Sequence, residues 1–511
     1  MKNLRIPVII GLICLIGCKS NQESEVLPIQ QRQVTQLSQQ QVSSQIDNIL
    51  RQNGEFEWSM ASTEVVWNVL VNHDSVLVIG YEPEGFGNVN EQIHQLDLQS
   101  QLWTEARTNV INQIQLVYDQ LGVNKIAREQ VLNVHESLPY FHLKVSEVEV
   151  LDRLRQLTQV RYSEPATYIP AEGAIGSELR IESKLGCGND PNFSIPSSDY
   201  VTVSPSAKIP WNFYNMNIPS AWSISTGDNV TVAVIDTGIS PDQAKLNSQF
   251  SSGESTGRYR AKFGTYVSSW WWWASPDGPD DQCGHGTQMS GAATAPRSSG
   301  GSSLGVAYDA NLVSIRGTGD VVIESGREKN GVSDALVLAG NRSDVKIISM
   351  SLGTPFSSGQ VADAVRYAYN RGKLIFAAAG TSTSITSFVG VIFPATMNET
   401  VAVTGIKDNG YNQCNTCHKG SKVDFVAVMQ RGSNNDRTSL TLAESGNQPS
   451  NVGGSSVATA TTAGIAALVW ATNPNQTRDQ VLNRLKNASD FYPSRNSNYG
   501  YGLIDALEAV Q

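Results

Sequence analysis

The stretch NVTVAVID, residues 229–236, is an almost unbroken run of apolar side chains that ends in an acid. Comparable strand-like runs follow it, and patterns typical of helices separate them. The strand-like runs are ANLVSIR, VKIISMSLG, KLIFAAAG and TVAVTGI, and the helical ones are HGTQMSGAATA, GVSDALVLAG, GQVADAVRYAYNRG and SVATATTAGIAALVW. Buried strands that alternate with helices are typical of a parallel sheet covered on both faces. The sequence therefore predicts a doubly wound, mainly parallel α/β domain over residues 210–511.

An acid, Asp236, stands at the carboxyl end of the first of these strands, where function gathers in such sheets. A carboxylate there contributes little to packing, but it is well placed to face a cleft. The Asp-Thr-Gly sequence that it opens also occurs in aspartic proteases, which need two such copies in one site. The chain has one copy, which argues against that class of enzyme.

A histidine between two glycines, His285, opens the first helical run of this domain. A lone histidine is more often structural than catalytic, but the choice here is narrow. The chain has six histidines, and only His285 and His418 lie in the predicted α/β domain. A general base that works near neutral pH is therefore predicted to be His285.

The stretch NVGGSSVATATTAG, residues 451–464, places two serines between two glycines and a helical run of small residues. Gly453 and Gly454 allow a tight turn of the backbone. A serine at the start of a helix has backbone N–H groups and the positive end of the helix dipole beside it, which help to hold an oxyanion. The apolar GIAALVW that follows is not typical of a linker, so a catalytic serine is predicted here.

The chain order Asp, His, Ser is that of subtilisin rather than of chymotrypsin or the α/β-hydrolases. Residues 210–511 resemble the subtilisin-like (S8) serine proteases. The resemblance rests on VIDTGI, GHGTQMSG, GVAYDANLVSIR, IISMSLG, FAAAG, GGSSVATATTAG and YGYGLIDALEAV. It implies hydrolysis of peptide bonds through an acyl-enzyme, with Ser456 as nucleophile, His285 as base and Asp236 as the group that orients the base. Protein or peptide substrates are the implied partners.

The resemblance also implies where a peptide substrate binds. Family members pair the substrate with a Ser-Leu-Gly strand, and an Ala-Ala-Gly segment lines the pocket for the residue before the cut. These segments correspond to Ser351, Leu352 and Gly353, and to Ala378, Ala379 and Gly380. Such small residues imply an open pocket that accepts sizeable apolar side chains.

The main departure from the family pattern is Thr381, which stands where the family has an asparagine that donates to the oxyanion. Two interpretations stay open. Either the Thr381 hydroxyl replaces that donor, or the backbone N–H of Ser456 acts nearly alone. Since the three catalytic candidates are intact, an active protease is predicted, and a pseudoprotease that binds peptides without cleaving them is the alternative.

The chain begins with MKNLRIPVIIGLICLIGCKS, a short basic start followed by an apolar run too short to span a bilayer. Residues 1–17 are predicted to be a signal peptide, so export to the cell envelope or beyond is expected. The sequence before Cys18 resembles the lipobox of bacterial lipoproteins, which implies lipidation of Cys18 and a membrane anchor. Residues 18–74, rich in Gln and Ser, are predicted to form a polar tether.

Residues 75–170 carry the order strand, helix, two strands, helix, strand, which predicts a ferredoxin-like α+β plait. The end of this region, SEVEVLDRLRQLTQVRYSEPATY, resembles the inhibitory propeptides of subtilisin-like proteases. A zymogen whose own propeptide blocks the cleft is therefore implied. Residues 171–209, rich in Gly, Ser and Pro, are expected to be a linker that contains the processing site.

Four cysteines remain after residue 18, and disulfides are permitted in an exported protein. They are Cys187, Cys283, Cys414 and Cys417. Pairing Cys414 with Cys417 and Cys187 with Cys283 is one of three connectivities. The sequence CNTCHKG also has the C-x-x-C-H form of a haem attachment site, so a haem- or metal-binding envelope protein is a distant alternative.

Charge and composition limit the remaining functions. The net charge of −10 argues against a nucleic-acid surface. Asp277, Asp280 and Asp281 are candidates for calcium, although a solvated acidic loop is the simpler interpretation; no cofactor is predicted and no metal ligand is assigned. The tryptophans at 270–273 cannot all face one core, so some are expected at a rim.

Overall fold

The computed structural model describes residues 31–122, 131–175, 177, 187–269, 274–381 and 390–511. The predicted signal peptide, the lipidation candidate Cys18 and the tryptophans at 270–273 therefore lie outside the described residues.

The C-terminal part of the chain is built on one parallel sheet of eight strands, in the order β16-β13-β12-β11-β10-β7-β9-β8. Neighbouring strands run parallel throughout. The strands are β7 (Thr231–Asp236), β8 (Arg260–Gly264), β9 (Asn311–Arg316), β10 (Val345–Met350), β11 (Leu374–Ala378), β12 (Val401–Lys407), β13 (Phe425–Gln430) and β16 (Gly502–Leu503). The prediction of a doubly wound, mainly parallel fold is confirmed.

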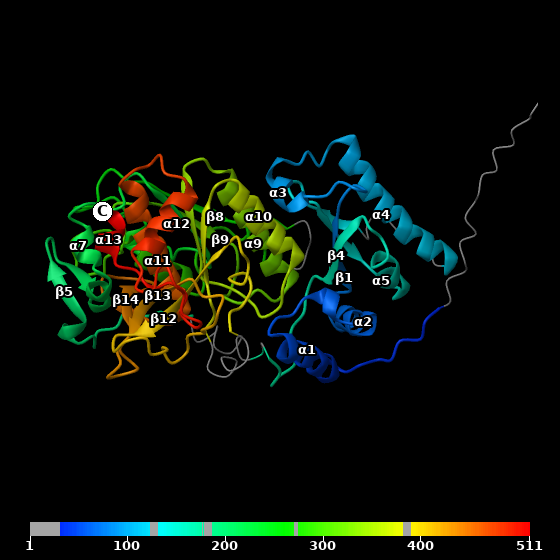
Figure 1. Ribbon diagram of the computed structural model, residues 1–511, viewed down its shortest axis with the longest axis horizontal. Helices are drawn as coiled ribbons and strands as arrows, with labels where there is room; N and C mark the ends of the chain where they lie inside the picture. The colour runs from blue at the N-terminus through cyan, green and yellow to red at the C-terminus, as the bar shows by residue number, and fades with distance from the viewer. Residues whose placement is uncertain (1–30, 123–130, 176, 178–186, 270–273, 382–389) are drawn as a thin grey trace, which may run out of the picture.

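Strand β7 is buried on both faces, as its apolar sequence predicts. Val232 and Val234 face the core beneath helices α8 (His285–Thr294) and α11 (Gly454–Ala471). Ala233 and Ile235 point the other way, toward α9 (Gly326–Asn341) and α10 (Gly359–Asn370). This alternation is the two-residue period of a strand, and it fixes which helices cover each face (Figure 1).

The strand order reverses at β7. Strand β9 lies on one side of β7, and β10, β11 and β12 follow on the other side. A crevice at the carboxyl ends of the strands is expected at such a reversal. Asp236 ends β7 and Ser351 directly follows β10, so both residues stand at this crevice.

Helix α11 is the central helix of the core. Within the part of the chain that the structure describes, it alone is long and apolar enough to cross a membrane, but 89% of it is buried inside the protein. Its small residues let it pack closely: a Cβ at Gly464 would come within 2.6 Å of Val306. The helix is therefore the support of the nucleophile candidate and a core element.

The N-terminal part forms the predicted ferredoxin-like plait. Its four antiparallel strands lie in the order β2-β3-β1-β4. They are β1 (Val76–Tyr81), β2 (Val131–Val134), β3 (Tyr140–Lys144) and β4 (Val160–Pro165), and the helices between them include α3 (Val89–Gln92), α4 (Gln101–Gln120) and α5 (Glu149–Leu154). The plait packs against α9 and α10 of the large domain, since Val76, Val78 and Tyr140 share an apolar cluster with these helices (Figure 1).

The prediction of a polar tether over residues 18–74 is wrong for its second half. Residues 39–72 form helices α1 (Gln39–Asn53) and α2 (Thr63–Asn72), which pack into the core of the plait. Val42, Ile46 and Leu50 recur at the helical spacing of four and are buried. The abundant Gln residues hid this narrow apolar stripe.

The prediction that residues 171–209 are a linker with the processing site is wrong for the later part of this range, while residues 176 and 178–186 lie outside the described residues. Strands β5 (Tyr200–Val203) and β6 (Ala207–Pro210) form a hairpin on the large domain. Just before it, the buried carboxylate of Asp199 pairs with Arg431 and Arg437. The large domain therefore begins before residue 210. Its remaining elements are α7 (Ile218–Ala221), β14 (Ser439–Leu442), β15 (Pro449–Val452), α12 (Arg478–Asn487) and α13 (Ala506–Val510).

Candidate active site

The carboxylate of Asp236 lies directly beside the ring of His285. Asp236 Oδ1 is 2.8 Å from His285 Nδ1, and it also accepts a 2.8 Å hydrogen bond from the backbone N–H of Thr237. Both side chains are buried. Asp236 thereby fixes the plane of the ring and favours the tautomer that carries its proton on Nδ1, which leaves Nε2 to accept a proton.

The charge state of His285 is set by two opposing effects. Burial is the largest single effect and lowers the pKa of His285, but the charge and hydrogen bond of the Asp236 carboxylate, together with the charges of Asp281 and Asp320, outweigh it. The pKa therefore lies above the usual 6.5. A base whose conjugate acid is stabilised in this way holds an abstracted proton well.

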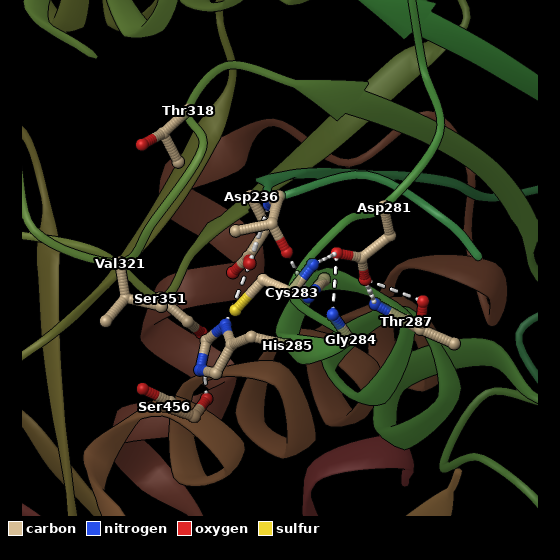
Figure 2. A network of polar contacts seen from close by, with 12 residues as sticks. Asp236, Asp281, Cys283, Gly284, His285, Thr287, Thr318, Val321, Ser351 and Ser456 are labelled. Atoms are coloured by element: carbon tan, nitrogen blue, oxygen red, sulfur yellow. Dashed lines mark hydrogen bonds and ion pairs between the residues drawn. The ribbon is translucent and has the colours of Figure 1, made fainter. Parts of the chain in front are cut away.

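Ser456 lies at the start of α11, and its side chain lies against the His285 ring on the side away from Asp236 (Figure 2). The turn before it depends on Gly454, whose φ is +84°. A Cβ there would also approach the Thr381 hydroxyl to 2.9 Å. From the other side, the Ser351 hydroxyl donates a 2.9 Å hydrogen bond to the carbonyl of Ser456. The structure thus brings Asp236, His285 and Ser456 together in one row.

The start of helix α8, which carries His285, is held by Asp281. Its carboxylate accepts hydrogen bonds from the N–H groups of Cys283, Gly284 and Thr287, at 2.9, 2.7 and 2.9 Å, and from the Thr287 hydroxyl at 2.7 Å (Figure 2). Sequence reasoning missed this role. An acid placed just before a helix start was the available signal.

The neighbouring acids have separate structural partners. Asp280 is paired with Lys262 at 3.3 Å, and Asp277 accepts from the backbone N–H of Ser268. Among the described residues, no group of three or more His, Cys, Asp or Glu is arranged to hold a metal ion. The calcium candidates named from the sequence are therefore not gathered around a common point.

The hydroxyl of Thr381 is part of a small network with Ser455, the first of the two serines. Thr381 Oγ1 accepts a 3.1 Å hydrogen bond from the N–H of Ser455 and lies 2.9 Å from Ser455 Oγ. Ser455 Oγ in turn accepts from the N–H of Gly380 at 3.2 Å. The hydroxyl groups of Thr381 and Ser455 therefore connect the end of β11 to the turn that precedes Ser456.

A pocket of about 230 Å³ opens beside Ser456 and His285. Most of the predicted substrate-binding residues line it, together with residues that were not predicted. The lining includes Ser351, Leu352, Gly353, Ala378, Gly380 and Thr381 of the predicted set, and Asn189, Gln288, Val321, Val322, Ile392 and Asn451 besides. Ala379 is fully buried and does not belong to the lining.

The strand expected to receive substrate already has a partner. Gly353 donates its N–H to the carbonyl of Val321 and accepts at its own carbonyl from the N–H of Ile323, both at 3.2 Å. Val322 and Gly353 thus form a parallel β-bridge. A peptide that binds along Gly353 needs the same two backbone groups.

The four cysteines in the described part of the chain form two disulfides, Cys187–Cys283 and Cys414–Cys417. The joined sulfurs of Cys414 and Cys417 leave no thiol for a haem thioether. His418, beside them, is fully buried, and burial lowers its pKa to about 4. It packs on the backbone of Gly380, where a Cβ would come within 2.6 Å of Nδ1. This geometry does not favour the haem interpretation.

Comparisons with known proteins bear on the large domain. A model of the subtilase family matches residues 227–502, more than half of the chain. M-protease of Shouchella clausii (strain KSM-K16) is 30% identical over 343 residues, which are 65% of this chain and 78% of that protein. Subtilisin BL of Lederbergia lenta is 32% identical over 308 residues, 59% of this chain and 99% of that protein.

Two solved structures are also similar. MycP1 from the ESX-1 type VII secretion system is 22% identical, with a TM-score of 0.47, and the match covers 63% of this chain and 92% of that one. A protease from Pseudoalteromonas arctica PAMC 21717 is 24% identical, also with a TM-score of 0.47, and the match covers 59% of this chain and 96% of that one.

Proposed function

This chain belongs to the subtilase family and is a serine endopeptidase, and from this premise we propose that it works through Ser456, His285 and Asp236 and is made as an exported zymogen. The observation that carries the proposal is the row of three side chains, with the 2.8 Å contact between Asp236 and His285 on one side of the ring and Ser456 on the other (Figure 2).

The chemistry follows from that row. Ser456 Oγ attacks the carbonyl carbon of the scissile bond while His285 Nε2 takes the hydroxyl proton. Asp236 stabilises the imidazolium that forms. Nε2 then gives the proton to the leaving amine, which departs and leaves the acyl group on Ser456. Water, deprotonated by the same nitrogen, releases the acid product and regenerates the serine.

We assign the second oxyanion donor to the Thr381 hydroxyl, beside the backbone N–H of Ser456. A hydroxyl has one proton to donate and two lone pairs. Ser455 Oγ accepts from Gly380 N–H, so it can donate its own proton to Thr381 Oγ1. Thr381 then accepts two bonds from Ser455, one from N–H and one from O–H, and its proton is left to donate into the pocket that it lines.

The zymogen proposal is supported by the closed substrate strand. The end of the plait bonds to the segment that directly follows residues 321–323: Tyr168 N–H donates to the carbonyl of Glu324 at 3.2 Å, and Gly326 N–H donates to the Thr167 hydroxyl at 3.1 Å. The Lys329 ammonium donates to the carbonyl of Ala166 at 2.8 Å. By binding the residues that directly follow, the plait keeps residues 321–323 in place against Gly353, where a peptide would otherwise pair.

Export and membrane attachment rest on the N-terminal sequence. The short basic start and apolar run favour a signal peptide, and the sequence before Cys18 favours lipidation. Two disulfides in the large domain accord with an oxidising compartment. Labelling with a radioactive fatty acid that is lost in Cys18→Ala tests the anchor.

The second candidate, a pseudoprotease, is motivated by Thr381. A fluorophosphonate probe separates the two, because it reacts with an activated serine. Labelling of the processed protein that disappears in Ser456→Ala and persists in Ser455→Ala is expected. Absence of labelling in the processed wild type, which retains Ser456, would establish the pseudoprotease instead.

A further inference from the structure

A short segment within the predicted linker and processing region, residues 187–192, is fastened to the large domain beside the active site. Its first residue, Cys187, forms the disulfide with Cys283, which lies two residues before His285. The segment is half-buried to exposed. It belongs to neither the plait nor the eight-stranded sheet, and among its residues only Cys187 was singled out by the sequence analysis.

Backbone hydrogen bonds fix the segment at three separate places. Gly188 N–H donates to the carbonyl of Cys283 at 2.8 Å, and the carbonyl of Asn189 accepts from the N–H of Glu444 at 3.0 Å. Asn192 N–H donates to the carbonyl of Pro449, at the start of β15, at 2.9 Å. Together with the disulfide, these bonds hold the segment in place, also if processing creates a new chain end just before it.

The segment also reaches the strand that leads into the nucleophile turn. The side-chain amide of Asn192 donates a 2.6 Å hydrogen bond to Asn451 Oδ1. Both Asn451 and Asn189 line the pocket that contains His285 and Ser456. A side chain of this segment therefore forms part of the wall of the cleft.

Asn189 lies at one end of the cleft. Asn189 lies against Gly284, where an added Cβ would be 3.2 Å from its side-chain nitrogen. In Figure 2, Cys283 and Gly284 lie on the opposite side of the His285 ring from Ser351 and Val321. If the acyl half of a substrate pairs along residues 351–353, the half that leaves must pass over Asn189.

Cleavage of the chain anywhere before residue 187 does not free this segment, because the disulfide and the three backbone bonds remain. Resting on the proposed protease function, we propose that residues 187–192 form a permanent wall on the leaving-group side of the cleft. Asn189 contacts the substrate residues that follow the scissile bond, so the segment next to the removed propeptide sets specificity there.

The test compares two substrates with the same acyl half, using the processed protein. One is a peptide p-nitroanilide, with no residue after the cut, and the other is an internally quenched peptide that continues for several residues after it. The readout is kcat/KM for the peptide divided by kcat/KM for the anilide, since this ratio isolates contacts on the leaving side. Asn189→Ala should lower the ratio about threefold to tenfold, the effect of one hydrogen bond.

The double variant Cys187→Ser/Cys283→Ser should lower the same ratio at least as much, because it releases the whole segment. Its matched control is Cys414→Ser/Cys417→Ser, which removes the other disulfide, so any effect of that control should fall equally on both substrates. Should the double variant fail to fold, Asn189→Ala still decides. A ratio unchanged in Asn189→Ala overturns the wall, whereas a wild type that cleaves neither substrate overturns the proposed function itself.

Discussion

The guanidinium of Arg161, on β4 of the plait, donates two hydrogen bonds of 2.7 Å to the carboxylate of Asp363, on α10 of the large domain. The Asp363 side chain has no exposed surface, and that of Arg161 is 12% exposed. The hydroxyl of Tyr162 adds a third bond to the same carboxylate, at 3.0 Å. Without Arg161, the buried carboxylate of Asp363 keeps Arg366, at 3.8 Å, as its cationic partner but loses both of its short charged hydrogen bonds.

We predict that Arg161→Ala weakens the attachment of the plait. Breaking a buried pair costs about 3–5 kcal/mol, and this loss should appear in the free energy of unfolding of the unprocessed Ser456→Ala chain, measured in urea. When Ser456 is intact, the Arg161→Ala protein should become active sooner after refolding than the wild type.

The matched control for Arg161 is Arg32→Ala. Arg32 pairs with Asp152 at 3.3 Å, but both side chains are more than a third exposed. Exposed pairs contribute about 0–1 kcal/mol, so this variant should change the free energy of unfolding little. Equal losses from the two variants would contradict the assignment of Arg161 as an anchor.

A second prediction concerns pH and Glu164, which lies buried between plait and large domain. Its carboxylate accepts from the Ser358 hydroxyl and from the N–H of Gly359, at 3.1 and 2.8 Å. Burial raises the pKa of Glu164 from 4.5 to about 7, against the opposing effect of Lys329. Because the folded chain keeps this proton at pH values where the unfolded chain has lost it, the contribution of Glu164 to stability falls as pH rises from about 4.5 to about 7.

The size of that loss is about 3 kcal/mol, at about 1.4 kcal/mol for each unit of pKa shift. Glu164→Gln is neutral at every pH and should remove this part of the pH dependence. The measurement is the free energy of unfolding on either side of this range, near pH ~5 and pH ~8, in Ser456→Ala chains with and without Glu164→Gln. Identical differences between the two pH values would show that Glu164 does not titrate in this range.

The sequence predicted most of the sheet and the row of Asp236, His285 and Ser456, because each of these residues sits in a local motif at a strand or helix end. It failed where the decisive contact is between distant parts of the chain. The role of Asn189 depends on which of three disulfide pairings forms, and that of Thr381 on its distance to Ser455. Local sequence patterns contain neither the disulfide pairing nor this distance. The apolar spacing within α1, in contrast, was present in the sequence, but the many glutamines obscured it.

A third prediction tests the oxyanion assignment. Thr381→Val keeps the shape of the side chain but removes the hydroxyl, so kcat should fall by about 10²–10³, the cost of one oxyanion donor, a value itself measured on a subtilisin. Thr381→Ser should retain most of the activity because it keeps the hydroxyl. KM should change little in either variant, since the oxyanion forms only in the transition state.

The outcome that would remove Thr381 from the oxyanion site is equal activity of Thr381→Val and Thr381→Ser. Ser455→Ala provides a further check, because it takes away the proton that Thr381 accepts from Ser455 Oγ. This variant should lie between the other two, since the Thr381 hydroxyl remains but loses the bond that orients it.

The last prediction concerns the acid limb of the pH profile. His285 must be neutral to accept the proton of Ser456. Burial lowers the pKa of His285, but the neighbouring carboxylates, chiefly that of Asp236, raise it to a net value above 6.5. The value of kcat/KM should therefore decline with falling pH from a midpoint above 6.5. Asp236→Asn removes the negative charge, so the midpoint should move to lower pH while kcat falls by about 10⁴ through the wrong tautomer. A midpoint that stays in place in Asp236→Asn would mean that a group other than His285 controls the acid limb. His418 is not that group, because burial lowers its pKa to about 4, well below this range.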